Sequence, residues 1–464
     1  MKQWLQIYKS EFSDTLRLSI PIVIAQLGVV LMGVTDNLFV GRLLGAVPLG
    51  AAGLAVSLAF LVSSIGVGGL AVVGTLVSQA RGRNDGAEIN RLFRGGIRVA
   101  LLLGLVLGLA SMALAYFFGV FQQTPQVTEL ARNFMIIMSV SNIPLFLFVA
   151  ARQLCDGLAY PRVAMGITIS ALAINALLNY VLILGIGPFP EMGLYGSATA
   201  TLLSRTYMAV AILVYIRRAS VFKQYFSPAY RQQQITTEVG KVLRLGLPGG
   251  MTFFFEIATF SLAQVMVGWL GESSLAAHQI AMNMASTTYM MATGVSAAGA
   301  IRVGNAVGRR SSLLVRRAGT AAFLLSGALM GFCALIFVTA NEQLATLYIQ
   351  DNAEVATIAA GLLLMAGVFQ LSDGIQVVGV GVLRGLSDVN IPTIITLFAY
   401  WIMGLPVSYV LCFWFGMGVT GVWVGLLAGL SVAAILLTTR FFRMVKRMHL
   451  PAQEGTALET LPTL

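Results

Sequence analysis

The stretch Leu16-Arg17-Leu18-Ser19-Ile20-Pro21 returns in the second half of the chain as Leu243-Arg244-Leu245-Gly246-Leu247-Pro248, and this repetition decides the fold. A second match follows at nearly the same offset, where Val77 to Arg83 returns as Val303 to Arg309. Later matches keep the same order and nearly the same spacing, as when Tyr180-Val181-Leu182 returns as Tyr409-Val410-Leu411. The chain therefore consists of two related halves.

The composition shows what kind of halves these are. The chain has 464 residues, of which 58% are hydrophobic and only 10% are charged. Soluble domains carry about 25% charged residues, so an ordinary soluble protein is excluded. Apolar runs of about 20 residues, long enough to cross a bilayer as a helix, recur from Leu16 to Phe441. Three cysteines and two histidines argue against a disulfide framework and a His-rich metal site.

Twelve apolar runs predict an all-α integral membrane protein with six transmembrane helices in each half. Six is an even number, so the second half enters the membrane in the same orientation as the first. We therefore expect two six-helix lobes related by a pseudo-twofold axis along the membrane normal. The predicted spans are approximately 16–40, 49–78, 96–118, 134–155, 163–187, 194–216, 245–270, 275–300, 318–338, 356–383, 393–415 and 419–440.

The same pattern predicts the domain boundaries. The first lobe is expected to cover residues 1–222 and the second lobe residues 245–446. Between them, the polar residues 223–244 form a cytoplasmic linker in this interpretation. The polar tail, residues 447–464, is expected to be disordered.

The net charge of +11 is better explained by membrane topology than by nucleic acid, because the basic residues are spread between the spans. If the N-terminus is cytoplasmic, all Lys and Arg except Arg42, Arg132 and Arg205 fall in or beside cytoplasmic segments. Cytoplasmic loops carry such an excess of basic residues. Both termini are therefore expected in the cytoplasm.

Three acidic residues inside the predicted spans are candidates for function: Asp36, Glu256 and Asp373. A charged side chain near the bilayer centre costs roughly 2.5 to 3.5 kcal/mol on insertion scales, so such residues usually serve a functional site. Arg205 is the one basic residue inside a span. An ion pair with Asp36 and an orientation toward a central cleft are both open for Arg205.

Polar neighbours in the first half suggest a cation site around Asp36. Asn175 and Asn179 are four residues apart, so they share one face of a helix. Thr199 in the following span is a further oxygen donor. These residues could form an oxygen cage with Asp36, although polar stripes also serve as hydrogen bonds between helices.

The second half offers a comparable set around Glu256 and Asp373. Polar stripes run along two of its spans, and aromatic residues flank Glu256. The candidates for lining a site or a substrate path are Phe255, Gln279, Asn283, Gln376 and, from the first half, Arg205. Hydrogen bonding between helices is again the alternative.

Several short motifs together resemble one transporter family. They are Thr35-Asp36-Asn37, Phe254-Phe255-Glu256, Ala276-Ala277-His278-Gln279 and Ser372-Asp373-Gly374-Ile375-Gln376. In this combination, and over about residues 12–445, the chain resembles the multidrug and toxic compound extrusion (MATE) family, on its NorM-like side.

The resemblance implies a multi-pass transporter, not an enzyme, in a bacterial inner membrane. It implies export of organic cations or amphiphilic drugs in exchange for Na+ or H+, by lobes that open alternately to the two sides. No cofactor apart from the coupling ion and no nucleic acid is expected, and the transporter is expected to be a monomer.

The resemblance also implies one cation site in each lobe. The first-lobe site would consist of Asp36, Asn175, Asn179 and Thr199, and the second-lobe site would include Glu256 and Asp373. If the coupling ion is Na+, its ligands are expected among Asp36, Asn175, Asn179, Glu256 and Asp373.

Two other classes of membrane protein fit the sequence less well. A lipid-linked oligosaccharide flippase shares the two-lobe plan but would need several cationic residues in its cleft to bind pyrophosphate, and Arg205 is a single one. An integral membrane enzyme would need a constellation of acids, histidines or metal ligands that the spans lack.

Overall fold

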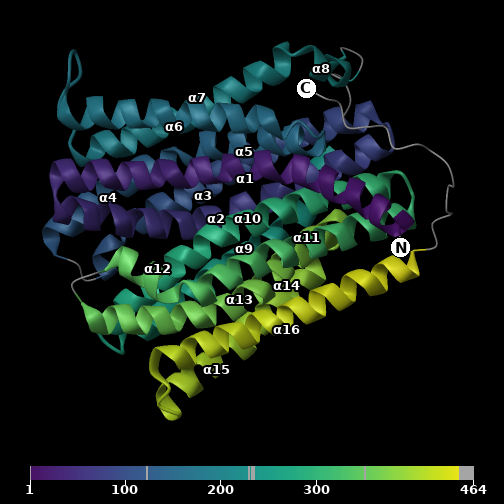
Figure 1. The fold of residues 1–464 in the computed structure, drawn as a ribbon. Coiled ribbons are helices and arrows are strands. Elements are labelled where there is room, and N and C mark those ends of the chain that lie inside the picture. The colour runs from purple at the N-terminus through teal and green to yellow at the C-terminus, as the bar shows by residue number, and fades with distance from the viewer. Residues whose placement is uncertain (1, 122–123, 228–229, 231–235, 350–351, 449–464) are drawn as a thin grey trace. The chain divides into compact units, whose positions relative to one another are not determined.

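The computed structural model describes residues 2–121, 124–227, 230, 236–349 and 352–448, and these form helices without any strand. Of the tail expected to be disordered, residues 447–464, Arg447 is the last residue of the final helix, and the residues from 449 onward lie outside the described residues. The predicted all-α membrane fold is confirmed (Figure 1).

The helices follow the predicted spans in order. Those of the first half are α1 (Lys2–Leu44), α2 (Ala46–Gly82), α3 (Gly86–Tyr116), η1 (Phe118–Phe121), α4 (Pro125–Val140), α5 (Asn142–Gly157), α6 (Pro161–Leu184), α7 (Leu194–Arg218), α8 (Ser220–Lys223) and η2 (Gln224–Phe226). Those of the second half are α9 (Thr236–Gly268), α10 (Glu272–Gly308), α11 (Ser312–Thr339), α12 (Asn341–Tyr348), α13 (Ala353–Gly385), α14 (Asn390–Leu397), η4 (Phe398–Gly404), α15 (Leu405–Tyr409), η5 (Val410–Trp414) and α16 (Gly418–Arg447).

Within the described ranges, ten helices are long and apolar enough to cross a membrane, and eleven if the bent pair α4 and α5 is one span. The pair bends by 41° at Ser141. The remaining predicted span, 275–300, lies within α10, whose 37 residues include the polar side chains Gln279 and Asn283. Such polar residues lower the mean hydropathy of α10, although the helix is long enough to cross a membrane.

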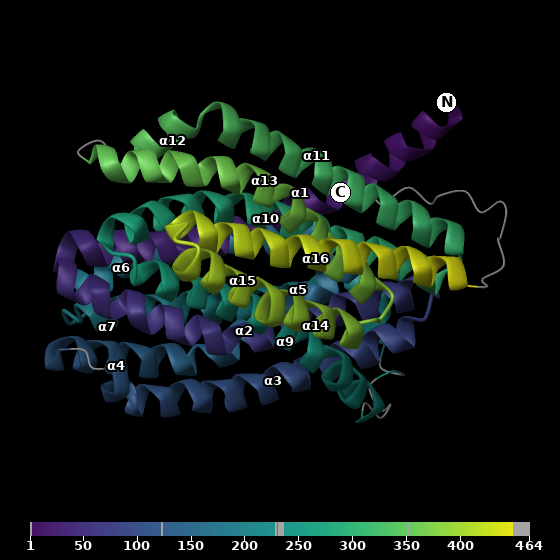
Figure 2. The ribbon, with the colours of Figure 1, turned by 90° about the horizontal axis from the view of Figure 1, so that it is seen from below.

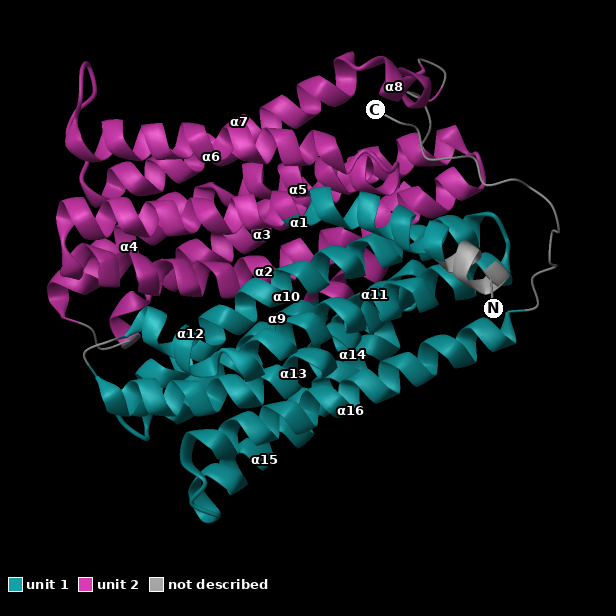
Figure 3. Ribbon diagram, in the orientation of Figure 1, with its two compact units in different colours: residues 1–23, 251–464 teal, residues 24–250 magenta. Residues whose placement is uncertain are grey.

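The chain divides into two compact units (Figure 3). Unit 1 consists of residues 1–23 and 251–464, and unit 2 of residues 24–250. Helices α1 and α9 therefore each contribute their first part to one unit and their remainder to the other. Both helices contain an internal proline, Pro21 in α1 and Pro248 in α9, and an internal proline removes a backbone hydrogen bond and bends a helix.

In unit 2, α5 packs against α2, α3 and α7, and α6 packs against α7. In unit 1, α13 lies beside α10, α11 and α16 (Figures 1 and 2). In each unit one helix, α5 or α13, thus packs against three others.

The eleventh predicted span forms one continuous helical segment with two π-helical parts, η4 and η5. The first π-helical part contains Tyr400 and Trp401 and ends at Gly404. A Cβ at Gly429 of α16 would lie 2.7 Å from the Ala399 carbonyl oxygen and 3.1 Å from Gly404 Cα. This close backbone contact fixes the π-helical turn that carries Tyr400.

Candidate ion-binding sites

In unit 2, three side chains from two helices bind the carboxylate of Asp36. Asn175 Nδ2 and Asn179 Nδ2, on α6, donate to Asp36 Oδ1 over 3.1 Å and 2.6 Å. Thr201 Oγ1, on α7, donates to Asp36 Oδ2 over 2.7 Å. The two asparagines therefore meet Asp36 on one helix face, as their spacing suggests.

Thr199 makes a different contact from the one expected. Its Oγ1 donates to the Tyr195 carbonyl oxygen of its own helix over 2.8 Å. Residues two apart on a helix do not share a face, so only one of Thr199 and Thr201 can point at Asp36. No signal in the sequence favoured Thr201 over Thr199.

Three side-chain oxygen atoms on the two helices that bind this carboxylate, α6 and α7, are buried and have no hydrogen-bond partner. They are Asn175 Oδ1, Asn179 Oδ1 and Ser197 Oγ. An unpartnered buried polar atom costs about 1 to 3 kcal/mol, and two of these oxygens belong to the amides that bind Asp36 Oδ1. They therefore suggest a ligand beside the carboxylate. A small cation, which needs several oxygens, fits this donor set.

Arg205 is partly buried, and its Nη1 donates to Ser141 Oγ, 2.6 Å away at the bend between α4 and α5. Across the described residues, Arg205 and Asp36 form no ion pair, although the guanidinium lies within electrostatic range of the carboxylate. The ion pair that the sequence left open is therefore not formed. The side chains that contact the Asp36 carboxylate are instead Asn175, Asn179 and Thr201.

In unit 1, Glu256 and Asp373 are 6% and 2% exposed and lie within electrostatic range of each other. The Tyr289 hydroxyl, on α10, donates to the Glu256 carboxylate. Gln370 Nε2 donates to Thr288 Oγ1 over 2.5 Å. The structure thus brings the two predicted acids of the second half together, on α9 and α13.

This second cluster also has buried oxygens without partners. They are Glu256 Oε1, Asp373 Oδ1, Gln370 Oε1, Gln376 Oε1 and the Tyr400 hydroxyl. Tyr400 lies within electrostatic range of both acids. Beside it, Trp401 Nε1 donates to the Phe255 carbonyl oxygen over 3.3 Å, which holds the π-helical turn against α9 next to Glu256.

The other candidates of the second half make contacts of their own. Gln279 Nε2 donates to Asn283 Oδ1 over 3.3 Å, and Gln279 Oε1 accepts from Gln264 at 3.2 Å, in exposed positions. The Phe255 ring packs edge-on against Trp401, with a centroid separation of 6.0 Å. The structure does not join Gln279 or Asn283 to the two acids by hydrogen bonds.

Sequence reasoning missed Thr201, Tyr289 and Tyr400 as neighbours of the acids. Tyr289 lies on the same helix as Gln279 and Asn283 but outside their four-residue spacing. Tyr400 reaches the cluster from a π-helical turn, and π-helical turns are frequent at functional sites but follow no period that a sequence pattern reveals.

The structure is a multi-pass helical protein with carboxylates inside its membrane spans. Acids in this position mark pathways for ions and substrates, which is typical of membrane transporters. The sequence profile of the MatE family matches residues 21–181 and 248–410. The two matches begin at Pro21 and Pro248, which are the prolines of the internal repeat. The chain belongs to the MatE family, and the resemblance to MATE transporters is confirmed. Members of this family are transporters, so the protein is a transporter and not an enzyme.

Individual proteins agree with this assignment. The chain is 36% identical over 458 residues to a "Probable multidrug resistance protein NorM" of Rhizobium meliloti (strain 1021), covering 95% of each chain. It is 32% identical over 433 residues to the "Multidrug resistance protein NorM" of Burkholderia vietnamiensis, covering 92% of this chain and 93% of that protein. The fold matches the eukaryotic MATE transporter AtDTX14 with a TM-score of 0.86 at 19% identity, covering 95% of this chain and 99% of that one.

Proposed function

We propose that this protein exports organic cations and amphiphilic drugs across a bacterial inner membrane in exchange for Na+ or H+. The observation that carries the proposal is the presence, in each unit, of an intramembrane carboxylate accompanied by buried oxygens without partners. The names of the NorM relatives support multidrug export as the activity.

In unit 2, Asp36 would supply the charge that attracts the coupling ion. Asn175 Oδ1 and Asn179 Oδ1 are available to replace part of the hydration shell of a Na+ ion, as oxygen ligands do in ion-selective proteins. Thr201 holds the second carboxylate oxygen in place. A proton would need only the carboxylate, so the amide oxygens favour a metal cation at this site.

In unit 1, Glu256 and Asp373 would form a single second site. Tyr289 orients the Glu256 carboxylate, while the Tyr400 hydroxyl and Gln376 Oε1 provide additional oxygens. Two carboxylates in electrostatic range repel each other when both are ionised. A bound proton, Na+ ion or cationic drug would relieve this repulsion.

Exchange would follow if one site binds either the coupling ion or the drug but not both. The two fluxes are coupled when outward-open and inward-open states bind these ligands with different affinities. We propose that the lobes open alternately, that both termini lie in the cytoplasm, where basic loops accumulate, and that the transporter is a monomer.

The test is uptake of a fluorescent cationic dye into vesicles that contain the purified protein. A Na+ gradient and a pH gradient are imposed in separate experiments, and we expect at least one of them to drive transport. Asp36→Asn should abolish gradient-driven transport, whereas Glu354→Gln, a change at an exposed acid, should not. Failure of both gradients with several cationic dyes would contradict the proposed function.

A further inference from the structure

Helices α1 and α9 each change unit in the middle of the membrane-spanning helix. Residues 2–23 belong to unit 1, although the rest of α1 belongs to unit 2, and residues 236–250 belong to unit 2, although the rest of α9 belongs to unit 1. We call these two stretches the exchanged segments. Both end two residues after a proline, Pro21 or Pro248.

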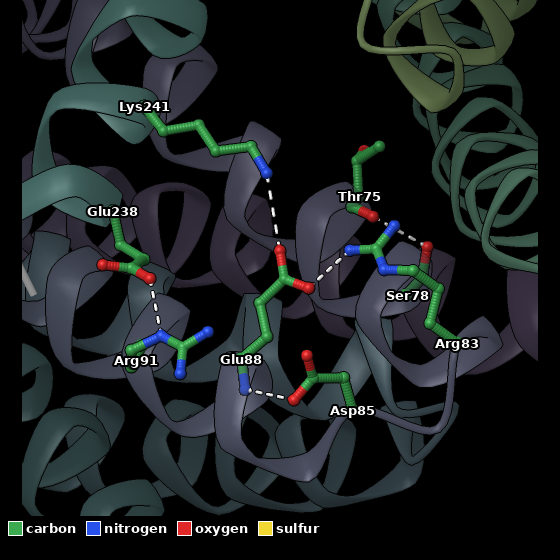
Figure 4. Close-up of polar contacts among 8 residues, drawn as sticks. All are labelled: Thr75, Ser78, Arg83, Asp85, Glu88, Arg91, Glu238 and Lys241. Carbon is green, nitrogen blue, oxygen red and sulfur yellow. Dashed lines mark hydrogen bonds and ion pairs between the residues drawn. The ribbon is translucent and has the colours of Figure 1, made fainter. Parts of the chain in front are cut away.

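In unit 2, ion pairs attach the exchanged segment 236–250 to α3. Arg91 Nε contacts Glu238 Oε1 at 2.6 Å, and Lys241 Nζ contacts Glu88 Oε1 at 3.5 Å. Figure 4 shows Glu88 between Lys241 and Arg83, whose Nη2 lies 2.6 Å from Glu88 Oε2. In one ion pair α9 supplies the acid, and in the other it supplies the base. Together the two pairs hold the start of α9 against α3.

In unit 1, Arg302 of α10 attaches the exchanged segment 2–23. The guanidinium forms an ion pair with the Glu11 carboxylate and donates from Nη1 to the Glu11 carbonyl oxygen over 2.6 Å and to Thr15 Oγ1 over 2.7 Å. Asp14 Oδ2 lies 3.7 Å from the same guanidinium. Glu11 is only 3% exposed, so this attachment is shielded from water.

Glu11 and Glu238 occupy equivalent positions of the repeat, because each stands at the same distance before its proline, Pro21 or Pro248. Their partners are not equivalent, because Arg302 lies on α10, the second long helix of its half, while Arg91 lies on α3, the third. The same attachment is therefore made twice with different partner helices. A repeated outcome reached through different partners indicates that the attachment itself matters.

Close backbone packing reinforces both attachments. A Cβ at Gly250 would overlap the Ile65 carbonyl oxygen of α2, and a Cβ at Gly294 of α10 would overlap the Val23 side chain. Close helix packing of this kind resists separation, since small residues let two backbones approach. Each exchanged segment is thus held toward its N-terminal end by charge and near its proline by packing.

We propose that Glu11 and Glu238 are positioning residues for transport, which keep the exchanged segments attached to their units throughout the cycle. The bodies that move are then unit 1 and unit 2, and not the two sequence halves. This inference rests on the proposed exchange mechanism, because it concerns which parts of the chain move during that exchange.

Two engineered disulfides test whether the segments stay attached. An ideal Cβ at Gly95 lies 3.3 Å from Glu238 Cβ, and an ideal Cβ at Gly294 lies 3.3 Å from Val23 Cβ. Disulfides have Cβ separations of about 3.5 to 4.5 Å, so small shifts permit both bonds. The pairs Gly95→Cys with Glu238→Cys, and Val23→Cys with Gly294→Cys, are introduced into a parent in which the native cysteines are replaced (Cys155→Ser, Cys333→Ala and Cys412→Ser).

We expect both disulfides to form on oxidation. In the pair Val23→Cys with Gly294→Cys, which keeps both glutamates, the dye transport rate should stay within twofold of the rate after reduction. In the pair Gly95→Cys with Glu238→Cys, which lacks the Glu238 carboxylate, the oxidised protein should transport faster than the reduced one, because the disulfide replaces the lost ion pair. A loss of more than tenfold that reduction reverses would show that a segment must detach, and it would overturn the proposal. Absence of the cross-link would also overturn it, because the segments would not be packed as described. Absence of transport in the cysteine-free parent would instead indicate failure of the proposed function.

The role of the glutamates is tested by rescue. Glu11→Gln should lower the maximal transport rate at least fivefold, while the dye concentration for half-maximal rate stays within twofold. In the same variant carrying Val23→Cys and Gly294→Cys, oxidation should restore the rate, because the disulfide replaces the lost attachment.

For the second segment, the charge swap Glu238→Arg with Arg91→Glu should restore the rate that Glu238→Arg loses. A matched control is Glu354→Gln, an exposed acid outside both segments. If the rate follows only the amount of folded protein, or if neither the disulfide nor the swap rescues, the positioning role is contradicted.

Discussion

Asn179 Nδ2 donates to Asp36 Oδ1 over 2.6 Å, and this bond joins residues that are 143 positions apart in the chain. The oxygen of the same amide, Asn179 Oδ1, is buried and has no hydrogen-bond partner. One amide therefore both fixes the carboxylate and offers an oxygen beside it, as expected for a site that is organised before an ion binds.

The first prediction separates two threonines of α7. Thr201→Val should lower the affinity for the coupling ion about tenfold, because a hydrogen bond to a charged group contributes about 1.5 to 3 kcal/mol and Thr201 holds Asp36 Oδ2. Ion-dependent protection against thermal unfolding in detergent measures the affinity. Thr199→Val is the control and should change it less than twofold, since Thr199 bonds to its own helix. Equal effects of both changes would refute the assignment.

The second prediction concerns the partner of Arg205. Ser141→Ala should destabilise the protein by about 1.5 to 3 kcal/mol, because it removes a hydrogen bond to a charged group in a partly buried place. Ser139→Ala should cost less, because Ser139 Oγ bonds only to the Met135 carbonyl oxygen of its own helix. Thermal unfolding of the two variants gives the comparison. Indistinguishable midpoints would mean that the Ser141 bond does not hold Arg205.

The third prediction distinguishes ligand from scaffold at Tyr400. Because its hydroxyl is buried without a partner, Tyr400→Phe should leave the ion-free protein as stable as before, or more stable by up to about 1 kcal/mol. The same change should weaken ion protection of the second site. Tyr409→Phe, at an exposed position of the same helical segment, is the control. A loss of ion-free stability in Tyr400→Phe, with ion protection intact, would assign Tyr400 a structural role.

The fourth prediction treats Glu256 and Asp373 as one site. Glu256→Gln and Asp373→Asn should each weaken ion binding, and the double change should be little worse than either one, because residues of one site act as a unit. Ion-protected thermal stability of the two single variants and the double variant is the measurement. Fully additive losses would place the two acids in separate sites.

The membrane fold could be predicted from the sequence because its signals are long. Apolar runs long enough to cross a bilayer, and a repeat that spans half of the chain, are unaffected by local detail. The twelve predicted spans accordingly follow the helices of the structure. The start of α9 at Thr236, well before the predicted span at 245, was not visible, because the polar residues before Pro248 look like a linker.

The acids of the sites could be predicted because their placement is unfavourable in a membrane, but their partners could not. Thr199 and Thr201 differ only by which side of α7 faces Asp36, and a single sequence does not encode that rotation. Tyr400 depends on a π-helical turn. Glu11 and Glu238 look like ordinary solvated charges in the sequence, and their significance arises only when the exchanged segments are seen in the structure.

The central claim is that the coupling ion and the drug exclude each other from a carboxylate site. The most direct measurement is the dissociation constant of a fluorescent cationic dye for the purified protein, over a series of Na+ concentrations and pH values. The account predicts that the apparent dissociation constant rises in proportion to the concentration of the coupling ion, and that this rise disappears in Asp36→Asn or in Glu256→Gln with Asp373→Asn. A dye affinity that is independent of both Na+ and pH in the wild-type protein would contradict it.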